Sequence, residues 1–163
     1  MPKIVFLCTR NRFRSPLAAA MLKHELSARK LPGEWIVESA GSWVYDLIPP
    51  TPEAFFEAEK RGLDISSHIS LGIEALDLDS IDLLLVMEQG QKESILIDFP
   101  KLRDRIYLLS ELSGPGFSIP DPYVTKERSD IIAQEIETLI KENFEEIISL
   151  AEAVNQPQQK ISK

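Results

Sequence analysis

The chain has 163 residues, about the length of one domain, and its 44% hydrophobic and 27% charged residues are ordinary for a folded globular protein. A net charge of −8 argues against nonspecific nucleic-acid binding, which needs many lysine and arginine contacts to phosphate. Because Cys8 is its only cysteine, the chain cannot form an intramolecular disulfide. No apolar run is long enough to span a bilayer and the N-terminus lacks a signal-peptide layout, so we expect a cytoplasmic protein without a membrane partner.

The first half of the chain alternates predicted strands and helices. Apolar and β-branched residues predict strands over residues 3–7 and 35–38. The spacing of apolar residues predicts a helix over residues 15–29, with Ser15 as its N-cap and a proline at its first helical position. A second helix is predicted over residues 53–61, where a glycine follows the last helical residue.

The second half continues the same alternation. An uninterrupted apolar run over residues 82–87 is typical of a central parallel strand that is covered on both faces. A short helix over residues 90–97, a fourth strand over 105–109 and a stiff proline-rich loop over 114–123 follow. Residues 127–153 are predicted to form one long helix. Its expected buried stripe consists of Ile131, Ile132, Ile136, Leu139, Ile140, Phe144, Ile147, Ile148 and Ala151.

Strands that alternate with helices predict one α/β domain over residues 1–154, with a four-stranded parallel sheet and helices on both faces. Residues 155–163 are polar and are predicted to form a C-terminal tail. In open α/β sheets, ligands bind where the strands end. The segment that follows the first strand is therefore the first candidate for a functional site.

That segment is the run Cys8-Thr9-Arg10-Asn11-Arg12-Phe13-Arg14-Ser15-Pro16. A loop that closes between a strand and a helix N-terminus can turn its backbone N–H groups toward an anion, and the helix dipole adds positive potential there. Arg14, six residues after Cys8, supplies a fork of donors for two phosphate oxygens. The same field stabilises a thiolate on Cys8 and makes it a nucleophile. The segment therefore predicts a phosphate-binding loop with a nucleophile at its floor.

A second candidate residue is Asp121, which lies between two prolines. Phosphoryl transfer to a thiolate needs a proton for the departing oxygen, and the phosphoenzyme then needs a base that activates water. One carboxyl group on a stiff loop can do both, and the flanking prolines restrict its backbone. Taken alone, Asp121 would be explained as a turn residue. Beside the Cys8 loop, we expect it to be the general acid.

Residues 8–16 resemble the signature loop of the low-molecular-weight protein tyrosine phosphatases, C-x-G-N-x-C-R-S-P. The run Asp121-Pro122-Tyr123 is similar to the acid motif of that family, and residues 38–41 and 62–68 also resemble family segments. The resemblance implies a phosphatase-like domain that hydrolyses protein phosphotyrosine through a cysteinyl-phosphate intermediate, with no metal and no cofactor. Its partner would be a phosphorylated protein, and we expect a monomer or weak dimer.

The resemblance also implies a role for each matching residue. Cys8 would attack phosphorus, and Arg14 would bind the phosphoryl group. Ser15 would support the thiolate as a leaving group. Asp121 would act first as general acid and then as general base.

The other residues that match the family are expected to bind the substrate or to support the shape of the loop. The remaining loop residues would contact phosphate or substrate: Thr9, Arg10, Asn11, Arg12 and Phe13. Tyr45 and Tyr123 fall where the family places aromatic walls around the substrate ring. Ser39 and His68, together with Asn11, would form the polar network that holds the shape of the loop.

The chain departs from the signature at two positions. The family glycine is Arg10 here, and glycine tolerates backbone conformations that arginine resists. The second loop cysteine of the family, which can form a disulfide with the nucleophile, is Phe13. We also hypothesise that Arg10 and Arg12 enlarge the positive rim of the site and favour more acidic substrates.

Several alternative functions stay open. Phosphoarginine phosphatases share the signature loop. An arsenate reductase on the same scaffold would need an external thiol, because the chain has no further cysteine. An inactive phosphate-binding module is a third possibility, with Arg10 as the lesion. A zinc site formed by Cys8, His24 and His68 is weaker, because their spacing matches no common ligand pair.

Overall fold

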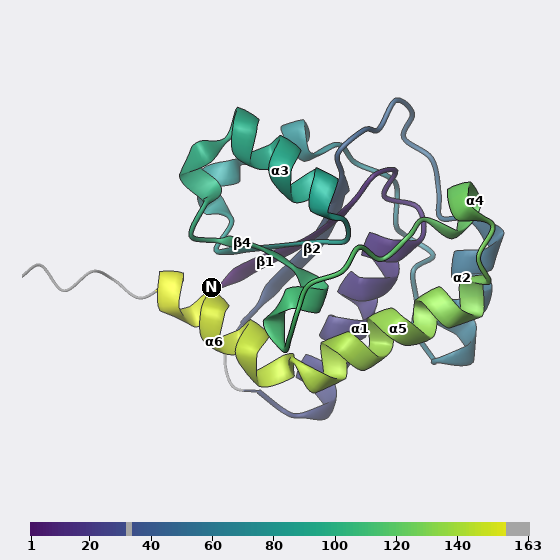
Figure 1. The fold of residues 1–163 in the computed structure, drawn as a ribbon. Coiled ribbons are helices and arrows are strands. Elements are labelled where there is room, and N and C mark those ends of the chain that lie inside the picture. The colour runs from purple at the N-terminus through teal and green to yellow at the C-terminus, as the bar shows by residue number, and fades with distance from the viewer. Residues whose placement is uncertain (32–33, 156–163) are drawn as a thin grey trace, which may run out of the picture.

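The computed structural model describes residues 1–31 and 34–155. This part of the chain forms a four-stranded sheet in the order β2-β1-β3-β4, and every neighbouring pair of strands is parallel (Figure 1). The strands are β1 (Lys3–Cys8), β2 (Ile36–Gly41), β3 (Leu83–Val86) and β4 (Ile106–Leu108). The prediction of a single α/β domain with a four-stranded parallel sheet is confirmed.

Within the described residues, six α-helices connect and follow the strands. They are α1 (Arg14–Ala28), α2 (Pro52–Lys60), α3 (Gln89–Asp98), α4 (Pro122–Thr125), α5 (Ser129–Glu142) and α6 (Phe144–Asn155). Short 3-10 turns occur at η1 (Ile73–Ala75), η2 (Leu78–Ser80), η3 (Pro100–Leu102) and η4 (Leu109–Leu112). None of the described helices is long and apolar enough to cross a membrane.

The sheet is covered on both faces, as predicted. Ile4 and Phe6 of β1 belong to the larger core cluster, with residues of α1, α5 and α6. Val5 and Leu7 point to the opposite face and belong to the second cluster, with Ile95 of α3. Figure 1 shows α3 on one side of the sheet and α1 and α5 on the other. Burial on both faces explains why the strand sequences are apolar without alternation.

The prediction of one long C-terminal helix is wrong, because the chain forms α5 and α6 with a break at Asn143. Asn143 is buried, and its Nδ2 donates to the Leu139 carbonyl at 2.8 Å. Its own backbone N–H binds the same carbonyl, so the side chain competes with the continuing helix. Ile131, placed in the buried stripe, is 56% exposed because the buried face of α5 begins one residue later, at Ile132. Most of the predicted tail, residues 155–163, lies outside the described residues.

Two further predictions, the N-cap of the first helix and the end of the proline-rich loop, are wrong. Helix α1 begins at Arg14, so Ser15 is not its N-cap; the cap position is Phe13, which makes no side-chain capping bond. The hydroxyl of Ser15 is instead committed to the loop that precedes the helix. The predicted loop over residues 114–123 ends in the short helix α4, because the Asp121 carboxylate caps it by accepting from the Tyr123 N–H at 3.0 Å.

The carboxyl end of β2 closely approaches the loop that follows β1. Cys8 and Gly41 are paired in register, and the Ser42 N–H donates to the Cys8 carbonyl at 2.9 Å. A Cβ atom at position 41 would lie 2.6 Å from the Thr9 carbonyl oxygen and 2.5 Å from a methyl carbon of Val44. The glycine therefore allows two backbone segments to come close together at the edge where the loop begins.

We expect Gly41→Ala to destabilise the protein by about 1–3 kcal/mol, since the new methyl group forces the β2 end and the loop apart. Urea unfolding measures this change. Gly114→Ala is a matched control, because a Cβ at that position would meet nothing within 4 Å. Equal stability of the two variants would contradict the close approach at Gly41.

Candidate active site

The loop between β1 and α1 is organised around Asn11, whose side chain is fully buried. Asn11 has a φ of 58°, a left-handed conformation that asparagine tolerates better than most residues. Its Nδ2 donates to Ser15 Oγ at 2.8 Å and to Ser39 Oγ at 2.9 Å. Its Oδ1 accepts the backbone N–H of Leu71 at 2.9 Å. One amide group thus ties the loop to α1, to β2 and to the segment before η1.

His68 supports the same residue from the main-chain side. Its Nε2 lies 2.8 Å from the carbonyl oxygen of Asn11. A carbonyl oxygen can only accept, so Nε2 carries the proton in this contact. The structure therefore brings Asn11, Ser39 and His68 together, as the resemblance implied.

Cys8 is buried at the start of the loop, and its sulfur has two hydrogen-bonding neighbours. The backbone N–H of Asn11 donates to Sγ at 3.3 Å, and Ser15 Oγ lies 3.0 Å from Sγ. Ser15 Oγ already accepts from Asn11, so its own proton is available to Sγ or to the Ala40 carbonyl at 3.3 Å. Both neighbours can donate to sulfur, so the loop directs two hydrogen-bond donors at the candidate nucleophile.

Arg14 is held on the other side of the loop with only 2% of its surface exposed. Its Nη1 donates to the Ile119 carbonyl at 2.7 Å and lies 3.4 Å from Glu88 Oε1. Its Nη2 lies 3.8 Å from Asp121 Oδ2. Two carboxylates and one carbonyl compensate the buried charge and fix the direction of the guanidinium group.

Sequence reasoning missed Glu88 and Gln91. Glu88 and Gln91 form a reciprocal capping box at the start of α3, directly after β3. Gln91 Nε2 also donates to Thr9 Oγ1 at 3.0 Å, so this helix start is linked to the loop. The signal was present as a Glu and a Gln three residues apart after an apolar strand, a capping-box pattern with Glu in the place of Ser or Thr.

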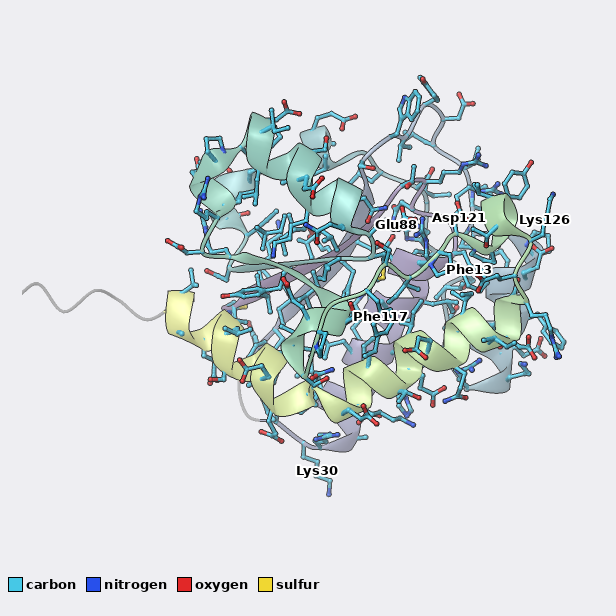
Figure 2. All side chains as sticks on the ribbon, in the orientation of Figure 1. Phe13, Lys30, Glu88, Phe117, Asp121 and Lys126 are labelled. Atoms are coloured by element: carbon cyan, nitrogen blue, oxygen red, sulfur yellow. The ribbon has the colours of Figure 1, made fainter. Side chains whose placement is uncertain are left out.

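A pocket of about 200 Å³ opens onto Cys8. Its lining is Cys8, Arg10, Arg12, Phe13, Arg14, Thr51, Glu53, Asp121, Pro122, Tyr123, Lys126 and Ser129. The Arg10 guanidinium lies 4.6 Å from the centre of the Tyr123 ring, which is exposed at the rim. Figure 2 shows Phe13, Glu88, Asp121 and Lys126 at the same end of the molecule. The sequence-predicted nucleophile, arginine and acid therefore meet at one pocket.

Tyr45 lies in a different place from Tyr123. It lines an adjoining hollow of about 620 Å³, where its ring packs at 5.5 Å from the Trp43 ring. Arg10, Arg12 and Asp121 line both spaces and form the ridge between them.

Arg10 fits the loop without left-handed strain. Among the described residues other than glycine, positive φ values occur at Asn11, Lys30 and Lys126 and not at Arg10. The position occupied by glycine in the signature thus has a backbone conformation that arginine adopts. Phe13, at the position of the second signature cysteine, is buried in the core cluster and lines the pocket.

Comparison with known proteins agrees with this geometry. Residues 3–160 match the family model described as low molecular weight phosphotyrosine protein phosphatase. The chain belongs to that family. A protein-arginine-phosphatase of Geobacillus stearothermophilus is 31% identical over 74% of this chain and 78% of the relative. The low molecular weight protein-tyrosine-phosphatase Ptp of Acinetobacter johnsonii is 31% identical over 74% of this chain and 79% of the relative.

Solved structures show the same family fold. The low molecular weight protein tyrosine phosphatase from T. tengcongensis superposes with a TM-score of 0.80 and 29% identity, over 90% of this chain and 99% of that one. The YwlE arginine phosphatase from Geobacillus stearothermophilus has a TM-score of 0.77 and 28% identity, over 98% of this chain and 99% of that one. Family membership confirms the resemblance drawn from the signature loop and the acid motif.

The stability of the protein is expected to depend on the protonation of His68. Burial lowers the pKa of His68 from its ordinary 6.5, the bond to the Asn11 carbonyl opposes this shift, and Lys23 adds to it. The folded state therefore favours neutral His68, and its contribution is fully present above pH 6.5 and lost as the pH falls through the lower folded pKa.

We expect the free energy of unfolding to fall more between about pH 7.5 and about pH 5 in the wild type than in His68→Gln, because glutamine at position 68 does not titrate. His24→Gln, at an exposed histidine of α1, is the matched control and should keep the wild-type pH dependence. Identical pH profiles for wild type and His68→Gln would contradict the assigned environment of His68.

The lone cysteine should also make oxidation damaging. A thiolate that peroxide converts to sulfenic acid is normally rescued through a disulfide, but Cys8 is the only cysteine and Phe13 fills the partner position. We expect a short peroxide pulse to be reversed by added dithiol, and long exposure without thiol to give sulfinic acid and permanent loss of activity. Mass spectrometry of the Cys8 peptide measures the products. Full recovery with dithiol after long exposure would show that a shielding partner is unnecessary.

Proposed function

We propose that this protein is a metal-independent phosphatase that hydrolyses phosphotyrosine in protein substrates. The reaction passes through a cysteinyl-phosphate intermediate, in which phosphorus is bonded to the Cys8 sulfur. The observation that carries the proposal is the convergence of Cys8, Arg14 and Asp121 on one pocket, with Ser15 and the Asn11 N–H directed at the sulfur. Family membership supports the same chemistry.

In the first step, the Cys8 thiolate attacks phosphorus while the bond between phosphorus and the tyrosine oxygen breaks. Asp121 donates its proton to the departing phenolate oxygen. Arg14 and the backbone N–H groups of the loop stabilise the charge on the three equatorial oxygens. The Ile119 carbonyl and Glu88 hold the Arg14 guanidinium group beside the pocket.

In the second step, the Asp121 carboxylate takes a proton from water as the water oxygen attacks phosphorus. The bond between phosphorus and sulfur breaks, and phosphate leaves. Ser15 donates its hydroxyl proton toward the sulfur that becomes a thiolate again; the contact at 3.0 Å supports this role. Asn11 Nδ2 donates to the Ser15 oxygen, so the hydroxyl proton of Ser15 is available to the Cys8 sulfur.

The pocket rim favours phosphotyrosine over phosphoarginine. Tyr123 offers an aromatic wall, and the cations Arg10, Arg12, Arg14 and Lys126 line the pocket against the two carboxylates of Glu53 and Asp121. A neutral phenyl ring enters such a rim without electrostatic cost, whereas the guanidinium group of phosphoarginine would meet like charge. Phosphoarginine hydrolysis is the second candidate, because one relative at 31% identity is a protein-arginine-phosphatase. Turnover of a phosphotyrosine peptide beside a phosphoarginine peptide separates the two.

The unprotected thiol of Cys8 bears on the cellular compartment in which the enzyme works. A catalytic thiol without a protecting partner needs a reducing compartment, which supports a cytoplasmic location. We expect a monomer or weak dimer as the active species. The partner is a phosphorylated protein.

Asp121→Asn is expected to lower the rate on substrates with poor leaving groups by roughly 10²–10⁴-fold. An activated aryl phosphate should lose less in the first step, because its leaving group needs little protonation. Single-turnover rates across a series of aryl phosphates measure this difference. Equal losses across the series would remove Asp121 from the role of general acid.

The covalent route itself is tested with Cys8→Ser. The variant should lose hydrolysis while it keeps affinity for phosphate, since only the nucleophile is changed. Hydrolysis of an aryl phosphate, with and without a chelator, is compared with wild type. Turnover by the serine variant near the wild-type rate, or activity that needs added metal, would overturn the proposed function.

A further inference from the structure

Three cations at the pocket lack a carboxylate partner. Among the described residues, no ion pair within 4.0 Å involves Arg10, Arg12 or Lys126, whereas Arg14 beside them has two acidic neighbours. The chain has a net charge of −8, with 26 acidic residues against 18 basic ones. Lys23, Lys30, Arg103 and Arg105 also have no ion pair among the described residues, but Arg10, Arg12 and Lys126 differ from them because they line the same opening.

The two arginines are held at the rim and away from the loop floor. The Arg10 guanidinium lies over the Tyr123 ring at 4.6 Å, and Arg12 Nε donates to the Pro49 carbonyl at 2.9 Å. Arg14 is the buried arginine that faces the floor. The positive charge of Arg10 and Arg12 is therefore directed at a part of the substrate outside the phosphoryl group.

Both rim arginines also line the adjoining hollow of about 620 Å³. Its walls include exposed apolar and aromatic side chains, among them Trp43, Tyr45 and Val124. The carboxylates of Asp46, Glu88 and Asp121 also line the hollow, so an acidic side chain is favoured beside the two arginines and an apolar one deeper in the hollow. Because Arg10 and Arg12 line both spaces, a peptide whose phosphorylated residue enters the pocket reaches the hollow by passing over these two side chains. The hollow offers space for the side chains that follow.

We propose that Arg10 and Arg12 recognise a carboxylate side chain next to the phosphorylated residue, so that the preferred substrate is an acidic phosphopeptide. This inference rests on the proposed function, because it concerns the same pocket. The peptide supplies the acidic partners that the two arginines lack within the described chain. The carboxylate lies over the ridge, and a neighbouring apolar residue occupies the hollow.

The test uses two fluorescent phosphotyrosine peptides that differ only at the residues flanking phosphotyrosine, glutamate in one and glutamine in the other. Binding is measured to Cys8→Ser, which we expect not to turn the peptides over. We expect about tenfold tighter binding of the glutamate peptide at low ionic strength, the range for two partly exposed charge pairs. The preference should shrink as salt is added.

The same pair of peptides is then measured with Arg10→Gln and Arg12→Gln, singly and together, in the Cys8→Ser background. Each single change should reduce the preference, and the double change should bring it within about twofold. Arg103→Gln is the matched control, since Arg103 is exposed beyond the amino end of β4, away from the pocket. Arg103→Gln removes one positive charge, as each rim change does. It should leave the preference for the glutamate peptide as large as in Cys8→Ser alone.

The ratio of the two affinities within each variant cancels any general loss of phosphate binding. No preference in Cys8→Ser, or a preference that survives the double change, overturns the inference. An equal loss of preference in Arg103→Gln overturns it as well, because net charge would then explain the effect. Failure of the wild-type enzyme to hydrolyse any aryl phosphate would instead refute the proposed function, and the binding ratios would still decide whether the arginines select acidic peptides.

Discussion

The geometry of the site depends on one buried side-chain amide. Asn11 takes a left-handed conformation in the middle of the loop, and its amide joins Ser15, Ser39 and the Leu71 backbone. A buried amide without partners is costly, so each of these bonds also keeps Asn11 in place. The turn at Asn11 brings its own N–H to the Cys8 sulfur. The hydrogen bond to the Cys8 sulfur, the position of the Ser15 hydroxyl and the turn of the loop therefore all depend on Asn11.

A second constraint is the compensation of a buried charge. Arg14 has lost nearly all its contact with water, so it requires the carboxylates of Glu88 and Asp121 and the Ile119 carbonyl. These groups come from the start of α3 just after β3, from the loop before α4 and from the start of α4, and β1 and β3 are neighbours in the sheet. Asp121 also caps α4, which restricts its position further. The parallel sheet thus brings the candidate acid to the nucleophile across more than a hundred residues of sequence.

The sequence predicted the sheet and the central chemistry because both depend on local patterns. Apolar runs located the buried parallel strands, and the spacing of Cys8 and Arg14 between a strand and a helix located the loop. His68 could be placed only by the family resemblance, because its contact with Asn11 spans 57 residues. The break at Asn143 was missed because a single buried side-chain bond decides it within an otherwise continuous helical pattern. Arginine in place of the signature glycine was expected to strain the loop at position 10. The left-handed conformation instead occurs at the next residue, Asn11.

The central claim is that phosphate passes through Cys8. It is tested most directly by mixing Asp121→Asn with an activated aryl phosphate, quenching in alkaline denaturant, and mapping the phosphorylated peptide by mass spectrometry. The first step proceeds with a good leaving group, whereas the second lacks its base, so the intermediate should accumulate. One phosphoryl group on Cys8 is the predicted result. Release of aryl alcohol with no phosphoryl group on Cys8 at any quench time, or with the group on another residue, would contradict it.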